Sequence, residues 1–276
     1  MSIAYLNGIY LPLEEACVSV SDRGFLFGDG VYEVIPVYGG KGFLREQHLA
    51  RLERSLAAIR IRNPHTRTQW EALLDELIER NGAGNQGIYL QVTRGSAPRL
   101  HAFPQGVSPT VLITSQPLTL SAGTKPAKAI TRPDIRWNRC DIKSIALIGN
   151  VLLRQEAIDV GCLETILIRD DQVTEGAASN VFVIHQGRVM TPPGTPLLLR
   201  GITRDFIIDL CAAVNLPAHE VDISEATLRG ADEIWITGSL MGILPVIELD
   251  GLPVGSGRTG PLWEKIYSLF RSSQLR

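Results

Sequence analysis

The chain has 276 residues, of which 45% are hydrophobic and 20% are charged, and its formal net charge is −2. This length predicts one large or two medium domains with a sizeable buried core. The near-neutral charge without a basic stripe argues against a nucleic-acid partner, and no apolar run reaches the roughly 18 residues that a membrane-spanning helix needs.

The first half of the chain predicts a smaller α/β domain at 1–117. Apolar residues alternate around Asn7-Gly8, which is typical of a hairpin over 3–11, and a strand at 31–38 turns at Gly39-Gly40. Apolar residues at helical spacing predict a helix at 46–61 and a second at 68–80. Further strands are expected at 88–93 and 110–114.

A stretch with Pro and Gly at both ends, 118–127, predicts an interdomain linker. The remaining chain, 128–276, is expected to form a larger C-terminal domain that binds a cofactor. Its strands are predicted at 164–168, 180–184 and 233–237, and its helices at 151–160, 203–214 and 262–270. This order lacks the strict strand-helix repetition of a doubly wound sheet, so the fold class is α+β, with two mixed α/β domains.

Cysteines and histidines indicate neither a disulfide nor a metal. The four cysteines are far apart with apolar neighbours, which favours reduced core thiols, and the five histidines form no metal-ligand pair at helical spacing. The amino terminus shows no signal-peptide pattern, so we expect a cytoplasmic protein. Phosphate-loop, dinucleotide and serine-hydrolase motifs are missing from the sequence as well.

Lysine is scarce in this chain. Five lysines stand against 22 arginines, and Lys143 lies in a mainly apolar run at 140–149. A guanidinium stays charged and is not a nucleophile, whereas an amine whose pKa is lowered by burial can attack a carbonyl. The commoner explanation is a half-buried lysine whose stem lies along apolar surface. Lys143 is therefore a candidate for imine chemistry that needs partners elsewhere in the sequence.

An imine-forming lysine without metal or nucleotide motifs predicts pyridoxal 5'-phosphate as the cofactor. Its ring nitrogen needs an acidic partner, and Glu175 is followed by small residues that would let a flat ring approach. Its phosphate needs backbone N–H groups, which Gly201-Ile202-Thr203 offers ahead of a predicted helix, with Ser239 and Arg51 as further donors. The alternatives are a solvated turn carboxylate, an ordinary helix start and an arginine on a solvated helix face.

These residues belong to motifs that run in the same order through a known family. The chain resembles the fold-type IV aminotransferases and, within them, the D-amino-acid transaminases. The matching segments extend over most of the chain: 22–34, 94–101, 140–144, 174–176, 179–182 and 201–205.

The resemblance implies a role for each candidate residue. Lys143 would hold the cofactor as a Schiff base and move the proton between substrate and cofactor, while Glu175 would pair with the ring nitrogen. Leu199 would pack against the ring, and the Tyr32 hydroxyl would face cofactor and substrate. The implied phosphate site consists of Arg51, Ile202, Thr203 and Ser239.

Arg99 and His101 are implied to bind the substrate carboxylate in the neighbouring subunit's site, which predicts a homodimer. The two residues are two positions apart, so an extended loop would project both side chains the same way. An arginine binds a carboxylate through two parallel hydrogen bonds, and a histidine adds a further donor. A solvated surface loop is the alternative.

The sequence therefore predicts a homodimeric pyridoxal-phosphate transaminase that exchanges the amino group between D-amino acids, such as D-alanine or D-glutamate, and 2-oxo acids, such as 2-oxoglutarate. A branched-chain L-amino-acid transaminase and aminodeoxychorismate lyase share the fold and stay open as alternatives. A cofactor-binding or regulatory protein without turnover is the non-enzymatic alternative. No metal, nucleic acid or membrane is expected to take part.

Overall fold

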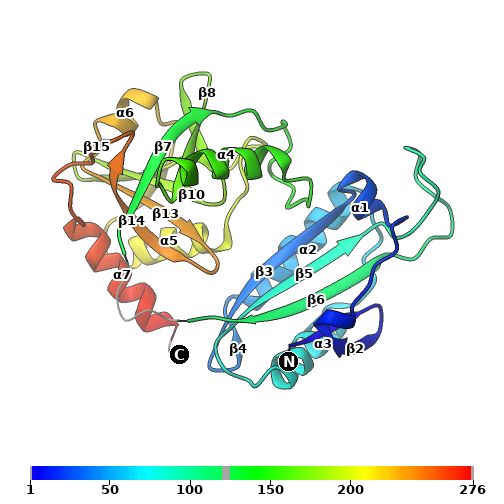
Figure 1. Cartoon of the computed structure of the whole chain (residues 1–276). Helices are drawn as coiled ribbons and strands as arrows, with labels where there is room; N and C mark the ends of the chain where they lie inside the picture. Colours follow the sequence, from blue (N-terminus) through cyan, green and yellow to red (C-terminus); the bar gives the residue numbers. More distant parts are fainter. Residues whose placement is uncertain (1, 120–124, 275–276) are drawn as a thin grey trace. The chain divides into compact units, whose positions relative to one another are not determined.

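The computed structural model describes residues 2–119 and 125–274 and consists of two compact units (Figure 1). The first unit comprises Met1–Leu120 and Ile142–Leu147, and the second comprises Ser121–Asp141 and Ile148–Arg276. Each unit has its own sheet and its own apolar core. The helices and the sheet in each unit confirm the predicted α+β class.

The sheet of the first unit has six strands in the order β2-β1-β6-β5-β3-β4, and all neighbours are antiparallel. Helix α2 packs on β3, and helix α3 packs on β6 and β1. The elements are β1 (Ile3–Leu6), β2 (Ile9–Pro12), the 3-10 helix η1 (Leu13–Glu15), α1 (Arg23–Phe27), β3 (Gly30–Tyr38), β4 (Lys41–Gly42), α2 (Arg45–Ala58), α3 (Arg67–Arg80), β5 (Gln86–Thr93) and β6 (Thr110–Pro117).

The sheet of the second unit has nine strands, with the order β12-β11-β10-β13-β14-β7-β8-β9 and β15 paired to β14. Three neighbouring pairs, β11 with β12, β14 with β7 and β7 with β8, are parallel. The elements are β7 (Ala127–Pro133), α4 (Ile148–Asp159), β8 (Glu164–Arg169), β9 (Gln172–Gly176), β10 (Asn180–His185), β11 (Arg188–Thr191), α5 (Ile202–Ala213), β12 (Ala218–Glu220), α6 (Glu225–Arg229), β13 (Glu233–Gly238), β14 (Gly242–Leu249), β15 (Leu252–Pro253) and α7 (Pro261–Ser273).

Local sequence signals explain where several elements begin and end. Asn7 and Gly8 both have positive φ, 49° and 99°, which is the turn that a two-residue hairpin needs. Thr66 and Gln69 form a reciprocal capping box at the start of α3. The predicted helix at 46–61 ends early, at Ala58, because Arg60 takes a left-handed φ of 58°. The Ile61 N–H then bonds the Leu56 carbonyl and closes the helix end.

Most predicted strands and helices are present with ends shifted by a few residues, whereas several short or polar elements were not predicted. Strand β7, which carries Lys128 and Arg132, has no alternating pattern, and α1 and α6 span only five residues each. The predicted domain bounds, 1–117 and 128–276, stay a prediction. Within the predicted linker, residues 120–124 lie outside the described part of the chain.

All four cysteines are free, but they are not all core residues. Cys140 and Cys211 are buried, Cys162 is partly buried, and Cys17 is exposed. The prediction of a core thiol was wrong for Cys17 because its apolar neighbour Val18 is itself 46% exposed. Across residues 2–119 and 125–274, none of the helices is long and apolar enough to cross a membrane.

Candidate functional site

Lys143 is held by its backbone against the sheet of the first unit. Its carbonyl accepts from the Tyr32 N–H at 3.0 Å, and its own N–H donates to Ser55 Oγ at 3.3 Å. The Lys143 Nζ lies 4.1 Å from the centroid of the Tyr32 ring. Within 2–119 and 142–147, no acidic side chain forms an ion pair with this amine. The structure therefore brings two predicted site residues together and leaves the amine without a counter-charge in its own unit.

Arg51 is fully inside the first unit rather than on a solvated helix face. Its Nε and Nη2 donate to the two carboxylate oxygens of Glu33, each at 2.8 Å, and His48 Nδ1 lies 2.8 Å from the same carboxylate. Burial alone would raise the pKa of Glu33, but the Arg51 charge and hydrogen bonds from Arg51 and His48 outweigh it and lower that pKa to about 2. Burial lowers the pKa of His48, partly offset by Glu33. The guanidinium is thus held rigidly.

The ionised Glu33 carboxylate makes a testable contribution to acid stability. Because its pKa is depressed in the folded chain, its contribution is complete above its ordinary pKa of 4.5 and is lost as pH falls toward about 2. We expect Glu33→Gln to lower the unfolding free energy by roughly 3 kcal/mol at pH 7 and by progressively less below pH 4.5. Urea unfolding of both proteins between pH 7 and pH 3 measures the difference. A constant difference over this range would contradict the assignment.

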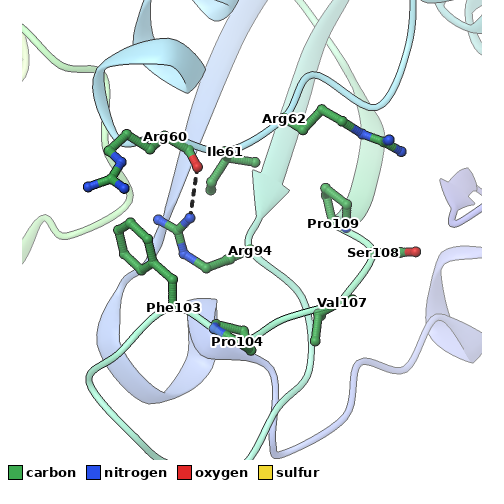
Figure 2. Close-up of a pocket in the computed structure, with 10 residues that line it drawn as sticks. Arg60, Ile61, Arg62, Arg94, Phe103, Pro104, Val107, Ser108 and Pro109 are labelled. Atoms are coloured by element: carbon green, nitrogen blue, oxygen red, sulfur yellow. Dashed lines mark hydrogen bonds between the residues drawn. The ribbon is translucent and has the colours of Figure 1, made fainter.

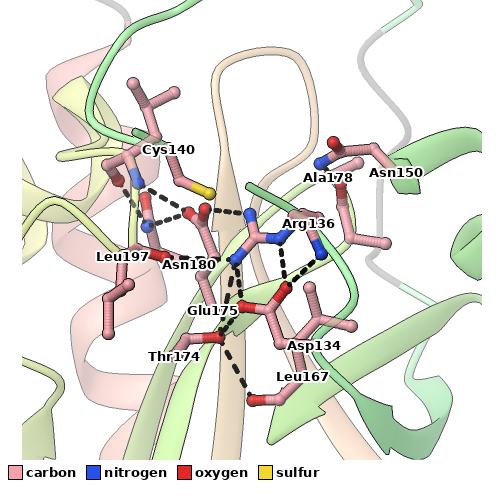
Figure 3. Close-up of polar contacts among 12 residues, drawn as sticks. Asp134, Arg136, Cys140, Asn150, Leu167, Thr174, Glu175, Ala178, Asn180 and Leu197 are labelled. Atoms are coloured by element: carbon pink, nitrogen blue, oxygen red, sulfur yellow. Dashed lines mark hydrogen bonds and ion pairs between the residues drawn. The ribbon is translucent and has the colours of Figure 1, made fainter. Parts of the chain in front are cut away.

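Glu175 lies at the end of β9 and is 5% exposed, so it is not the solvated turn carboxylate of the alternative interpretation. Strand β9, which includes Glu175, was not predicted from the sequence. Asn180 Nδ2 and the Leu199 N–H each donate to Glu175 Oε2 at 3.1 Å, and Arg136 donates to Oε1 (Figure 3). Every one of these donors stabilises the ionised carboxylate.

Arg136 and Asn180 are residues that sequence reasoning did not single out. Arg136 also pairs with the buried Asp134 and so is neutralised from two sides. Asn180 Nδ2 additionally donates to the Leu199 carbonyl at 2.7 Å, which ties the loop before α5 to the start of β10. Asn180 lies within the matching segment 179–182, but Arg136 carries no local signal among 22 arginines.

The helix start predicted near Gly201 is present, with α5 beginning at Ile202 rather than Arg204. Gly201 caps the helix without any side-chain hydrogen bond, so the N–H groups of Ile202 and Thr203 have no intrahelical acceptor. A Cβ at Gly201 would lie only 2.0 Å from Asn180 Oδ1, so the close approach requires glycine.

Strand pairing places a second group of donors at the same edge of this sheet. Asn180 at the start of β10 is opposite Thr237 near the end of β13, and Ser239 follows β13 directly. Thr237 Oγ1 is buried and has no hydrogen-bond partner within the described part of its unit. Uncapped helix N–H groups beside an orphaned buried hydroxyl fit an anion such as phosphate. The second unit therefore brings Glu175, Leu199, Ile202, Thr203 and Ser239 to one region.

Arg99 and His101 lie in the loop 94–109 that joins β5 to β6 in the first unit, and both are exposed. The loop is not extended here as predicted, because the Leu100 N–H donates to the Pro98 carbonyl and turns the chain at Arg99. Both side chains still lie against one ring: Arg99 Cζ is 5.1 Å and the His101 ring 5.5 Å from the Phe27 centroid. Both donors therefore contact the same aromatic side chain.

Comparisons with known proteins identify the family of this chain. The family model described as amino-transferase class IV matches residues 30–249. The D-alanine aminotransferase of Bacillus licheniformis is 41% identical over 98% of this chain and 96% of its own length, and that of Listeria innocua is 40% identical over 96% and 93%.

Solved structures agree in fold. The branched-chain amino acid aminotransferase of Escherichia coli superposes with a TM-score of 0.90 at 27% identity, over 98% of this chain and 93% of that one. The branched-chain amino acid aminotransferase of T.th., complexed with N-(5'-phosphopyridoxyl)-L-glutamate, gives a TM-score of 0.91 at 25% identity, over 99% and 93%. The chain is a member of the class IV aminotransferase family.

Proposed function

We propose that this protein is a pyridoxal-phosphate-dependent transaminase that exchanges the amino group between D-amino acids, of the D-alanine and D-glutamate type, and 2-oxo acids such as 2-oxoglutarate. The observation that carries the D-amino-acid assignment is the 41% identity to a D-alanine aminotransferase over nearly the whole of both chains. The paired donors Arg99 and His101 support it, since they offer a carboxylate a bidentate partner and a further donor.

The residues of both units fit this cofactor. From the first unit we assign Lys143 as the amine that binds it and Arg51 as a phosphate ligand. From the second we assign Glu175 to the ring nitrogen, Leu199 to the ring face and the donors Ile202, Thr203 and Ser239 to the phosphate. The uncapped N–H groups of α5 and the buried Thr237 hydroxyl, which has no partner in the described part of its unit, support the assignment of the phosphate ligands.

When bound, pyridoxal phosphate supplies an aldehyde that takes up the amino group and a protonated ring that withdraws electrons. The chain's own residues handle the proton and the charges. Lys143 Nζ would carry the proton between the substrate α-carbon and the cofactor. Glu175, whose carboxylate accepts hydrogen bonds from buried donors, would pair with the ring nitrogen. Tyr32 borders the amine through its ring and limits how the substrate approaches.

Two measurements test the function. The purified protein should be yellow and lose this colour on borohydride treatment, and a colourless protein after reconstitution would contradict the cofactor assignment. With 2-oxoglutarate as acceptor, we expect D-alanine to be consumed and L-leucine not. Activity with L-leucine alone would favour the branched-chain L-amino-acid transaminase, which the shared fold supports as a second candidate.

Arg99→Ala is expected to raise the KM for the amino donor with little change in kcat. Loss of a bidentate carboxylate partner costs about 2 kcal/mol, which corresponds to roughly a 30-fold rise in KM. Steady-state kinetics with D-alanine measures it, and Arg62→Ala, an exposed arginine of the same unit, is the control. An unchanged donor KM would show that Arg99 does not bind the carboxylate.

We further propose a homodimer in which Arg99 and His101 reach the neighbouring subunit's site. Large apolar side chains are exposed in both units, including Val20 (75%), Phe25 (76%) and Ile148 (73%), and a subunit interface would bury side chains of this kind. Mixed dimers of Lys143→Ala and Arg99→Ala subunits test the arrangement, because one site would then contain both intact residues. Activity at low donor concentration should return on mixing; if each Arg99 served its own subunit, mixing would restore nothing.

A cytoplasmic location is part of the same proposal. Thiols at all four cysteines are free, which suits a reducing compartment. Cell fractionation with antibodies against the protein would locate it.

A further inference from the structure

The loop 94–109 that carries Arg99 and His101 has almost no sheet pairing of its own. Its only bridge in the described chain joins Ser96 to Asp22. An irregular segment of this length orders its side chains only if other groups form hydrogen bonds with its backbone N–H and C=O groups. The groups that do so come mainly from one buried cluster.

Arg23, the first residue of α1, supplies three of these contacts. Its guanidinium donates to the carbonyls of Leu100 and Ala102 through Nη1 and to that of His101 through Nη2. The side chain is almost completely buried, so it has exchanged water for these main-chain oxygens. Arg23 Cζ also lies 4.9 Å from the centroid of the Phe27 ring, the same ring that Arg99 and His101 contact.

Asp29 fixes Arg23 and connects it to the base of the loop. Its carboxylate accepts from Arg23 Nε at 2.7 Å and from Arg94 Nε and Nη2 at 2.8 and 2.9 Å. Burial alone would raise the pKa of Asp29, but hydrogen bonds from both arginines lower it, so the carboxylate stays ionised. Two buried guanidinium groups are thereby held by one partly buried carboxylate.

Arg94 anchors the other side of the loop. Its Nη1 and Nη2 donate to the carbonyls of Arg60 and Ile59 at the end of α2, at 3.0 and 2.8 Å. Its guanidinium lies 3.7 Å from the centroid of Phe103 at a pocket of about 410 Å³ (Figure 2). The side chains of Arg60 and Arg62 point to opposite sides of this pocket, so its arginines do not converge on one anion. The contact between Phe103 and Arg94 instead packs the loop against the rest of the first unit.

We propose that Arg23, held by Asp29, is a positioning residue for the carboxylate-binding pair Arg99 and His101. Its guanidinium contacts both the main chain at 100–102 and the Phe27 ring. The backbone that carries the two donors and the ring against which they lie are therefore held by the same side chain. This inference rests on the proposed role of Arg99 in substrate binding. Lysine cannot replace Arg23, because a single ammonium cannot reach three carbonyls and Asp29 with the geometry of a planar fork.

Arg23→Lys is the test, with two readouts. We expect the KM for D-alanine to rise about 10-fold while kcat changes less than about threefold, the usual loss for two or three hydrogen bonds to a charged donor after partial compensation. Hydrogen exchange of the peptide covering 98–104 should become faster, which reports loop order independently of activity. Arg62→Ala, an exposed arginine that lines the same pocket, is the matched control and should change neither.

Asp29→Asn, which keeps the shape of the side chain, is the second variant and should shift both readouts in the same direction as Arg23→Lys. In an Arg99→Ala background, Arg23→Lys should raise the KM by less than it does in the unchanged protein, because only His101 of the pair is left to be positioned. Unchanged loop exchange, or faster exchange with an unchanged KM, would overturn the inference. If Arg99→Ala itself left the KM unchanged, the proposed function of the pair would fail instead, and the exchange result would still report whether Arg23 orders the loop.

Discussion

Replacing Lys143 by alanine is expected to reduce kcat for D-alanine by at least about 1000-fold, because we assign to this one amine both the binding of the cofactor and the transfer of the α-proton. Lys143→Arg should be equally inactive, since a guanidinium neither forms an imine nor releases a proton near neutral pH. Single-turnover absorbance of the cofactor on mixing with D-alanine measures the step directly.

The fold should survive this change. The contacts that place residue 143 are main-chain bonds to Tyr32 and Ser55, and they do not depend on its side chain. The circular dichroism and melting temperature of Lys143→Ala should therefore match the unchanged protein, and Lys128→Ala, at an exposed salt bridge, is the control lysine. Retention of a tenth of the turnover in a folded Lys143→Ala protein would remove this residue from the mechanism.

Glu175→Gln is expected to lower kcat roughly 100-fold, because a neutral amide cannot hold the ring nitrogen protonated as charge develops. The change also removes one of the two carboxylates that neutralise the buried Arg136, but Asp134 still pairs with that guanidinium. We therefore expect a larger loss in turnover than in stability. Steady-state kinetics measures the loss in turnover, thermal unfolding measures the loss in stability, and a visible absorbance spectrum reports the state of the bound cofactor.

Glu164→Gln is the matched control for Glu175. Glu164 is also a fully buried carboxylate of the second unit, and it accepts hydrogen bonds from Ser179 Oγ and the Thr165 N–H. Its replacement should lower stability without changing the absorbance of the bound cofactor. If both variants lost turnover equally, the loss would come from the packing of the sheet rather than from a partner of the ring nitrogen.

The sequence predicted the elements whose signal is local. The hairpin at Asn7-Gly8, the helix with Leu49, Leu52 and Leu56 on one face, and the uncapped start near Gly201 follow from turn chemistry and periodicity, and the structure has all three. The end of that helix was missed, because a left-handed Arg60 is strained and no composition rule anticipates it.

The candidate site divides in the same way. Lys143, Glu175 and the Arg99–His101 pair could be selected because each has a residue type matched to one chemical task. Arg136 and Arg23 could not, because their task is to bind Glu175 and loop carbonyls that lie far away in the sequence, 39 and about 77 residues distant. A sequence rich in arginine gives no sign of which guanidinium is buried.

In the loop 94–109, Arg23 donates hydrogen bonds to main-chain oxygens and not to side chains, and this affects which substitutions the loop can accept. The identities of residues 100 and 102 do not enter its hydrogen bonds, and the Leu100 side chain is 66% exposed. Substitutions at these positions are therefore free to alter the chemistry presented beside Arg99 and His101 while the turn keeps its shape. The backbone shape of the loop is thus independent of the side chains it exposes at 100 and 102. A library randomised at these two positions is where an altered preference for the amino donor should be sought first.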